Sequence, residues 1–187
     1  MKTFVKGVCS FLILLVTLRL SACATASFNI TRTGGAILGP FPANSVSGGI
    51  QAPYSPASGG AQLVLPSFSP VTIEAPLSAA DNTLIQTLVT GGRVQQVDIG
   101  FYVSAANAVQ TFPPLSRKIT LNQVVIPSYK DANDEANGPV TTFTMLFSKY
   151  TDTTYQLRSS SDAVTKTYTT TYDLITQRGT NSAVASR

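Results

Sequence analysis

Histidine is absent from the 187-residue chain. Its absence removes the commonest general base and the commonest metal ligand of proteins. A serine or threonine nucleophile would then need a lysine or an N-terminal amine as its base, and neither an S-x-x-K nor a G-x-S-x-G pattern occurs beyond residue 22. The sequence therefore predicts that the protein is not an enzyme and has no catalytic, cofactor-binding or metal-binding residue.

A long hydrophobic run is also lacking. The apolar stretch from Phe11 to Leu18 is far shorter than the roughly 20 residues that a membrane-spanning helix needs. Lys2 and Lys6 precede this stretch and small residues follow it, which is the order of a secretory signal. We therefore expect residues 1–22 to be a signal peptide and the remaining chain to form one exported domain.

Cysteine occurs only twice, as Cys9 inside the predicted signal and Cys23 at its end, so the exported domain cannot form an internal disulfide. The stretch Leu20-Ser21-Ala22-Cys23 resembles the lipobox of bacterial lipoproteins, in which cleavage leaves the cysteine first and its thiol carries a lipid. Cleavage after Ala24 or Ala26 would also satisfy the small-x-small rule of ordinary secretion. Both outcomes stay open, and Cys23 is the candidate lipidation site.

A surplus of positive charge is missing from the exported domain. Three of the thirteen Lys and Arg residues lie in the predicted signal, which leaves ten against nine Asp and Glu residues. Apart from Arg117 and Lys118 the cations are scattered singly, so they form no basic stripe of the kind that binds nucleic acid. We expect no nucleic-acid partner.

The exported domain does contain a series of short segments in which apolar and polar residues alternate. Turn residues bound each segment, a pattern typical of an antiparallel β-sandwich or β-barrel. The segments are Gln62–Leu65, Val71–Ala75, Val97–Val103, Lys118–Ile126, Thr142–Ser148 and Val164–Leu174.

One stretch between these strands predicts a helix instead. Ser78 is a good N-cap, Asp81 favours the first turn, and Gly91 with Gly92 would end the helix. Its apolar stripe is expected to consist of Leu84, Ile85, Leu88 and Val89. The fold class predicted from these patterns is mainly β, a small antiparallel β-barrel with one flanking α-helix.

A Gly- and Pro-rich stretch from Gly34 to Gly60 forbids a long helix or a central strand and predicts a long loop or an extended arm. Such a stretch is either a flexible linker or a functional arm. We expect residues 23–61 to form an N-terminal strand with this arm, residues 62–176 to form the barrel domain, and residues 177–187 to be a flexible tail.

An acidic stretch, Lys130–Gly138, matches a calcium-binding loop in part. The twelfth place of that loop needs a bidentate glutamate, but Thr144 stands there. The stretch is therefore expected to be a solvated hairpin loop.

The block from Val71 to Tyr155 contains, in order, a strand VTIEAPLS, a helix DNTLIQTLVTGG, and the strands RVQQVDIGFYV, RKITLNQVVIPSYKDA and TTFTMLFSKYTDTTY. This order resembles the Hcp family (haemolysin-coregulated protein), whose members form the tube of type VI secretion systems. The resemblance implies a small β-barrel with one helix, hexameric rings that stack into a hollow tube, and an arm that packs against a neighbouring ring.

Two functions are consistent with these patterns. The first is a structural, self-assembling Hcp-like protein of a type VI secretion-like system that is exported to the envelope. The alternative is a lipid-anchored or secreted β-barrel binding module of the envelope. The expected partners are further copies of the chain, envelope or secretion-system proteins, and the membrane if Cys23 carries a lipid. The expected location is anchored to the outer membrane, periplasmic or extracellular.

Overall fold

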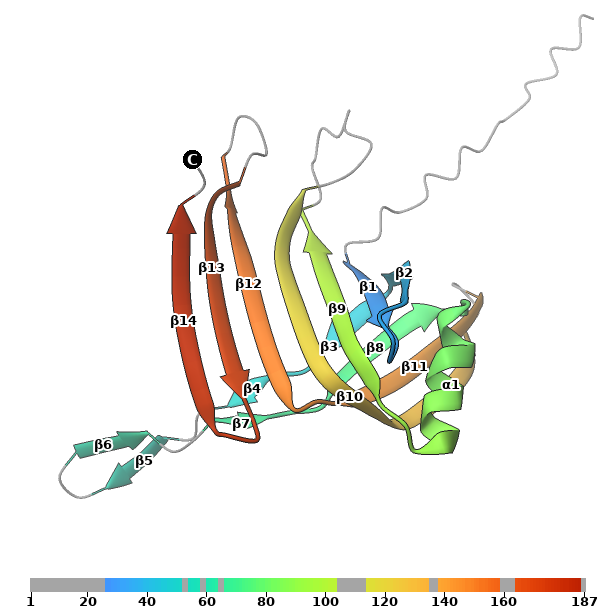
Figure 1. The fold of residues 1–187 in the computed structure, drawn as a ribbon, viewed down its shortest axis with the longest axis horizontal. Coiled ribbons are helices and arrows are strands. Elements are labelled where there is room, and N and C mark those ends of the chain that lie inside the picture. The colour runs from blue at the N-terminus through green and yellow to red at the C-terminus, as the bar shows by residue number, and fades with distance from the viewer. Residues whose placement is uncertain are drawn as a thin grey trace, which may run out of the picture.

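The computed structural model of the chain describes residues 26–51, 54–57, 60–63, 66–103, 114–134, 138–158 and 164–185. This part of the chain contains fourteen strands and a single helix (Figure 1), which confirms the mainly β prediction with one helix. No helix in it is both long enough and apolar enough to cross a membrane. The predicted signal peptide of residues 1–22 and Cys23 lie outside the described residues.

The strands follow one another along the chain, with the helix between the eighth and the ninth. Their bounds are β1 (Ala26–Thr31), β2 (Ile37–Ala43), β3 (Ser45–Ser47), β4 (Ile50–Gln51), β5 (Tyr54–Ala57), β6 (Gly60–Leu63), β7 (Ser67–Phe68), β8 (Val71–Pro76), α1 (Ala80–Thr90), β9 (Val94–Tyr102), β10 (Leu115–Asp134), β11 (Gly138–Leu146), β12 (Lys149–Leu157), β13 (Val164–Asp173) and β14 (Arg178–Ala185).

One ten-stranded antiparallel sheet carries the fold, and β10 is its centre. The first half of β10 pairs with β9 on one edge and with β12 on the other. From there the sheet continues through β1 to β2 on one side and through β13 to β14 on the other. The second half of β10 pairs with β11, which continues through β8 to β3.

The two halves of β10 belong to different parts of the sheet because this 20-residue strand is irregular in its middle. Gln123 has a positive φ of 53°, and the pairing with β11 shifts between Val125 and Ser128. Such an irregularity bends a strand and increases its twist. A single strand therefore links both walls of a curled sheet.

The predicted closed barrel is not found in the hydrogen-bond ladder of the described strands. The ladder is open between β2, which pairs with β1, and β3, which pairs with β8. Pro40 and Pro42 leave β2 without a backbone N–H at two positions, and strands with proline lie at sheet edges. The sheet curls around a core without closing on itself.

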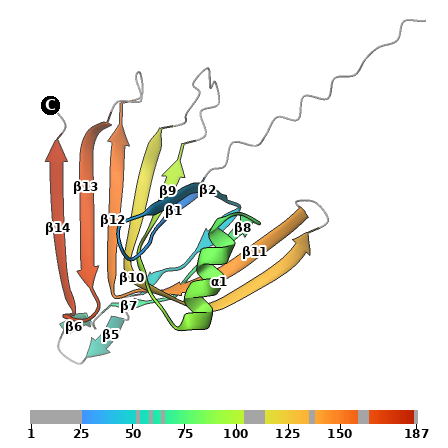
Figure 2. The same cartoon turned by 45° about the vertical axis from the view of Figure 1, so that its right-hand side comes forward.

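The core lies inside this curl and is centred on two phenylalanines. Phe28 of β1 and Phe143 of β11 are each 1% exposed, and their rings meet edge to face with centroids 5.4 Å apart. Ile30, Ile73 and Leu121 are fully buried in the same cluster. Helix α1 packs against β10 and β2 at one end of this core (Figure 2).

The structure confirms the predicted C-terminal end of α1 and the place of Asp81 in its first turn, but the N-cap is Ala79, without a side-chain cap hydrogen bond, and not Ser78 as predicted. The Ser78 hydroxyl accepts a hydrogen bond from the Ala80 N–H at 3.3 Å, and the Asp81 carboxylate accepts one from the Ser78 N–H. At the other end Gly91 is left-handed with φ 61°, and the N–H of Gly92 donates to the carbonyl of Thr87 at 2.9 Å.

The predicted buried stripe of α1 is wrong except for Leu84. The side of the helix that faces the core is rotated about the helix axis from the predicted side. Its buried residues are Ala80, Asp81, Thr83 and Leu84. Asp81 is held inside because its carboxylate accepts a hydrogen bond from the Tyr129 hydroxyl at 3.0 Å, and Thr83 accepts one from the guanidinium of Arg32. The other predicted stripe residues, Ile85, Leu88 and Val89, are exposed.

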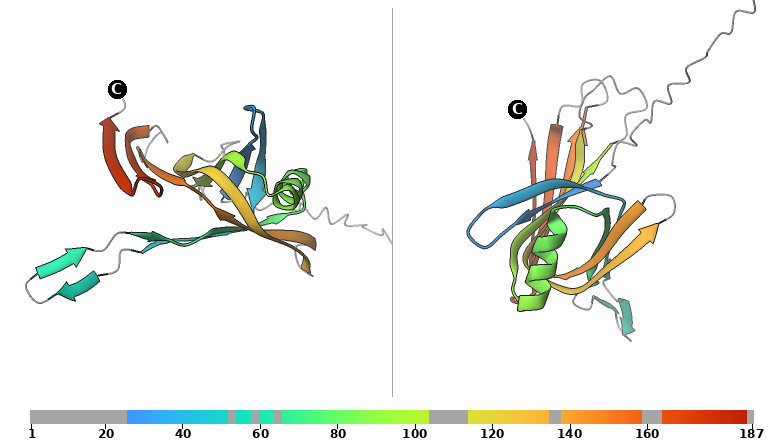
Figure 3. Two further views of the ribbon diagram at one scale, coloured as in Figure 1. Left: turned by 60° about the horizontal axis from the view of Figure 1, so that its bottom comes forward. Right: turned by 90° about the vertical axis from the view of Figure 1, so that its right-hand side faces the viewer.

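The Gly- and Pro-rich stretch divides into two parts. Residues 37–47, expected to be loop or arm, form β2 and β3, because edge strands tolerate proline where central strands do not. The described residues between 48 and 70 do form an arm, in which β4 pairs with β7 and β5 with β6. Figure 3 shows this ribbon extending away from the body.

The prediction of a flexible tail is wrong for residues 178–185. They form β14, which pairs with β13 over eight consecutive residue pairs from Asp173 with Arg178 to Lys166 with Ala185. All eight residues of β14 are exposed, so backbone pairing, rather than burial, orders this strand. Small polar residues carry no alternation signal, which is why the sequence did not indicate a strand.

Candidate assembly surfaces

Four aromatic side chains fix the base of the arm to the main sheet. Phe68 of β7 lies with its ring centroid 5.0 Å from that of Tyr172 and 5.6 Å from that of Tyr150. The Phe147 ring meets Phe68 edge to face at 6.1 Å. We call this cluster the arm anchor; it ties the arm to β12 and β13, which lie about a hundred residues later in the chain.

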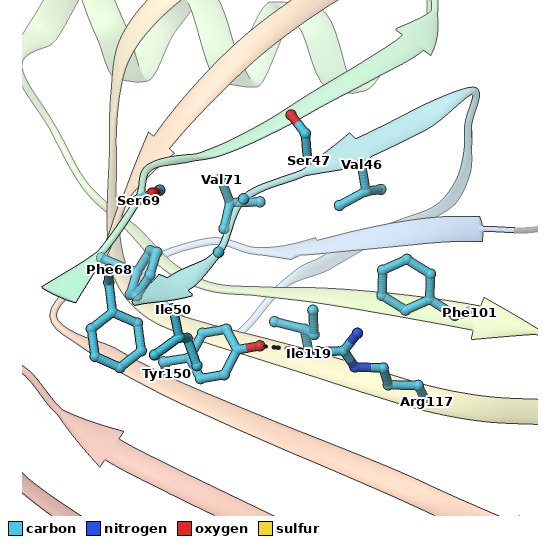
Figure 4. A pocket seen from close by; sticks show the side chains of 13 residues that line it. Val46, Ser47, Ile50, Phe68, Ser69, Val71, Phe101, Arg117, Ile119 and Tyr150 are labelled. Carbon is cyan, nitrogen blue, oxygen red and sulfur yellow. Dashed lines mark hydrogen bonds between the residues drawn. The ribbon is translucent and has the colours of Figure 1, made fainter. Parts of the chain in front are cut away.

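An apolar cavity of about 300 Å³ opens beside the arm anchor, between the base of the arm and the sheet (Figure 4). We call it the groove. Its walls come from β3, the arm base, β9, β10 and β12, and most of the lining side chains are aliphatic or aromatic. The residues that carry this character include Val46, Ile50, Phe68, Phe101, Ile119 and Tyr150.

Arg117 is the one ionisable group in the groove wall apart from the Tyr150 phenol, and it is neutralised there. Its guanidinium binds Asp152 through Nη2 at 2.7 Å and through Nε at 2.9 Å, and it lies 5.7 Å from the centre of the Phe101 ring. The hydrogen bond to Asp152 is the main reason that the pKa of Arg117 is raised. The one cation of the groove wall is therefore paired within the chain, and the rest of the wall is mainly apolar.

Tyr150 forms part of the groove floor, where Arg117 donates a hydrogen bond to the Tyr150 hydroxyl at 3.5 Å. Burial raises the pKa of Tyr150, and the Asp152 carboxylate raises it further. The phenol therefore stays protonated and uncharged at neutral pH. This keeps the floor of the groove free of negative charge.

The opposite face of the same sheet is polar and rich in hydroxyl groups. Facing threonines of β12 and β13 contact one another, with 3.2 Å between the hydroxyls of Thr151 and Thr171 and 3.5 Å between those of Thr153 and Thr169. On β9 and β10, Asp98 pairs with Lys118 at 3.1 Å. The two faces of this sheet thus differ in kind: one is apolar and grooved, the other is covered by hydroxyls.

The exposed side of α1 carries three apolar residues beside the uncharged polar residues Asn82, Gln86 and Thr90. Val89 is 74% exposed, Ile85 38% and Leu88 37%. The only ionisable residue of the helix is Asp81, which is buried. A helix that faces water usually carries charged residues on its outer side, so the outer side of α1 has the composition of a contact surface.

The predicted lipidation site, Cys23, lies outside the described residues. Within the described part of the chain, no three His, Cys, Asp or Glu residues come together as a metal site. The hairpin loop predicted for Lys130–Gly138 is wrong for residues 130–134, which form the end of β10 and pair with β11 up to Asp134 with Gly138.

The groove and the arm anchor were not predicted from the sequence. The lining residues come from segments that are more than a hundred positions apart, from Val46 to Tyr150. A partial signal was present, because aromatic residues interrupt polar stretches at Phe68, Tyr150 and Tyr172.

Comparison with known proteins connects this geometry to a family. The family described as "Type VI secretion system effector, Hcp" matches residues 42–155, from β2 to β12. No curated protein matches the chain. Solved structures of type VI secretion proteins share the fold at low sequence identity.

A structure described as a type six secretion system protein has a TM-score of 0.66 at 13% identity, over 83% of this chain and 98% of that one. Hcp1 from Salmonella typhimurium has a TM-score of 0.59 at 14% identity, over 83% and 99%. A type VI secretion system effector from Yersinia pestis has a TM-score of 0.56 at 14% identity, over 79% and 98%. These likenesses show a common fold, and because the family match spans more than half of the sequence, the chain belongs to the Hcp family of type VI secretion system proteins.

Proposed function

We propose that this Hcp-family chain is a structural subunit that is exported and self-assembles into hexameric rings, which stack into a hollow tube of a type VI secretion-like system. The observation that carries the proposal is the family match over residues 42–155. The surfaces of the molecule suit such a role, since apolar faces and sheet edges are features that other protein chains cover.

The arm supports stacking of rings. Its backbone is paired with itself through β4 with β7 and β5 with β6, so it projects as a ribbon with a defined shape. Its base is held by the contacts of Phe68 with Tyr150 and Tyr172. A ribbon that is fixed at its base and reaches beyond the body can contact a subunit of the next ring, which is the role that the family resemblance implies for it.

The free edge of the sheet supports self-association as well. β14 pairs with β13 on one side, and none of the other described strands pairs with its second side. The strand contains no proline and only one charged residue, Arg178 at its start. An unprotected edge strand of this length is a template for pairing with another chain.

Electron microscopy of the purified mature protein, with light scattering on the same sample, tests the proposal. We expect ring-shaped particles and stacks of rings, with a mass that is a multiple of the subunit mass. A protein that stays monomeric at high concentration would contradict the proposal. If such a monomer recovered a defined envelope protein from extracts, the envelope binding module would become the better account.

We also propose that the thiol of Cys23 carries a lipid that anchors the subunit to the outer membrane. Ala26 already belongs to β1, only three residues after Cys23, and such a span reaches about 10 Å at most. A lipid at Cys23 would therefore hold the body directly at the membrane surface. Mass spectrometry of the mature N-terminus is the test, with Cys23→Ser as its control: we expect a lipid-modified Cys23, and an unmodified start at Thr25 or Ser27 would contradict the anchor.

A further inference from the structure

Two apolar surfaces of the molecule lie far apart along its long axis. The first is the outer side of α1, with Ile85, Leu88 and Val89. The second is the groove, whose lining includes Ile50 and Phe68 at the base of the arm; Figure 1 shows α1 and the arm at opposite ends of the molecule. Within the described part of the chain nothing covers the exposed side of Val89, which is 74% exposed.

The two surfaces match in chemistry. The exposed residues of α1 include no ionisable group. The charged group in the groove, Arg117, already forms an ion pair with Asp152. Burying either surface against the other therefore leaves no unpaired charge, which is the costly outcome in a protein interface. A cavity of about 150 Å³ can hold a benzene molecule, so the groove, with about 300 Å³, has room for aliphatic side chains of a partner.

We propose that the outer side of α1 of one copy packs into the groove of the next copy. This inference rests on the proposed self-assembly and names the contact that produces it. The helix and the groove are different surfaces of the same chain, so the contact is head to tail, and every bound copy still offers a free helix at one end and a free groove at the other. A repeated head-to-tail contact closes into a ring when its rotation allows.

The contact between helix and groove forms the centre of a larger interface. A stable interface buries at least about 1,200 Å², more than three aliphatic side chains supply. The edge of β3 in the groove wall and the polar residues around Val89 would form the rim. Apolar residues at the centre of an interface account for most of the affinity, so a change at the centre is the informative one.

A charge at the centre of each surface tests the proposal. Val89→Glu places a carboxylate on the helix side, and Ile50→Glu places one in the groove, where Ile50 is 49% exposed. Thr90→Glu is the matched control: it adds the same charge to the same helical turn, but Thr90 lies beside Arg32 and Arg93 rather than on the apolar side. Because all three positions face solvent in the subunit, we expect all three variants to fold, which circular dichroism and thermal melting check.

Analytical ultracentrifugation and electron microscopy then measure assembly. We expect Val89→Glu and Ile50→Glu each to weaken self-association about 100-fold or more and to be monomeric where the wild type and Thr90→Glu form rings. A mixture of the two monomeric variants is expected to give dimers that grow no further. Each variant keeps one intact surface, so the mixture can make a single contact between the intact groove of the first variant and the intact helix of the second.

The outcomes separate this inference from the proposed function. If Val89→Glu forms rings as the wild type does, the helix is not at the contact, and the inference is wrong while the proposed function stands. If both variants are monomeric but their mixture is monomeric too, helix and groove do not bind each other, and the inference is again wrong. If the wild type itself forms no assembly, the proposed self-assembly and this inference are both wrong.

Discussion

The body around Phe28 and the extension formed by β12, β13 and β14 belong to one sheet, but they are stabilised differently. In the body both walls of the curl face the same core, where Phe28, Ile73 and Leu121 are 1% exposed or less. In the extension, no residue of β13 is fully buried, and every residue of β14 is exposed. Burial stabilises the body, whereas backbone pairing and the arm anchor hold the extension.

The difference indicates which part of the molecule depends on neighbours. A sheet with few buried side chains forms few apolar contacts, and its local opening costs less free energy than opening of the core. A covering surface from another chain would remove that weakness. The extension is therefore the part that we expect to gain most order on assembly.

The largest effect is expected from Phe28→Ala in the body. Phe28 contacts the rings of Phe41 and Phe143 at 5.4 Å each, and its removal leaves a cavity in the core. We expect a loss of about 3–5 kcal/mol in the free energy of unfolding, measured by chemical denaturation of the subunit. A loss below about 1 kcal/mol would show that the curl around Phe28 is not the main core.

A smaller and more local effect is expected from Phe68→Ala at the arm anchor. Phe68 is only partly buried, and it contacts Phe147, Tyr150 and Tyr172. We expect a loss of roughly 1–2 kcal/mol in the free energy of unfolding. Amide hydrogen exchange should become faster in β7 and β13 and stay unchanged in β1. An equal increase in all strands would mean that the anchor and the body unfold together.

Alkaline pH is expected to weaken the body and the anchor through two tyrosines. The pKa of Tyr129 is raised mainly by burial and then by its hydrogen bonds to Asp131 and Asp81. Burial also raises the pKa of Tyr150. A phenol whose pKa is higher in the folded state stabilises it fully below the unfolded pKa of about 10, and this contribution is lost as pH rises above that value.

We therefore expect the midpoint of urea unfolding to fall between pH 9 and pH 11, by the sign of these pKa shifts. The single variants Tyr129→Phe and Tyr150→Phe should each make this fall less steep. A fall of the same steepness in both variants would assign the effect to other groups.

The smallest effect is expected on the hydroxyl-rich face of the extension. The hydroxyls of Thr153 and Thr169 contact at 3.5 Å in a partly exposed pair. The double variant Thr153→Val, Thr169→Val should change the free energy of unfolding by about 0.5 kcal/mol or less, because valine favours strands and water replaces the lost bond. A loss of several kcal/mol would show that the hydroxyl rows, and not the backbone ladder, hold the extension.

Part of the fold could be predicted because its signal is local. The alternation in Val71–Ala75 and Val97–Val103 predicts strands that the structure confirms as β8 and β9. Gly91 ends α1 because a left-handed residue is needed there, and Asp81 lies in its first turn as expected. These features depend on residues that are close together in the chain.

Other features could not be predicted, because they depend on residues that are far apart. Which side of α1 is buried depends on Tyr129, whose hydroxyl binds Asp81 across 48 positions. The strand β14 exists because β13 offers it an edge, and its own small polar residues give no signal. The groove needs Val46, Phe101 and Tyr150 to come together, which only the curl of the sheet brings about.

The sequence by itself determined that the chain is built from strands with one helix, that histidine chemistry is absent, and that the residues from Val71 to Tyr155 follow the Hcp pattern. These properties depend on composition and on periods of two or of 3.6 residues. Only the tertiary structure decided that the sheet stays open between β2 and β3, and that Val89 of α1 faces outward. Such outcomes follow from long-range pairing and packing. The hydrophobic period of a helix or strand shows which of its residues share a side, but it does not show which side the rest of the chain will cover.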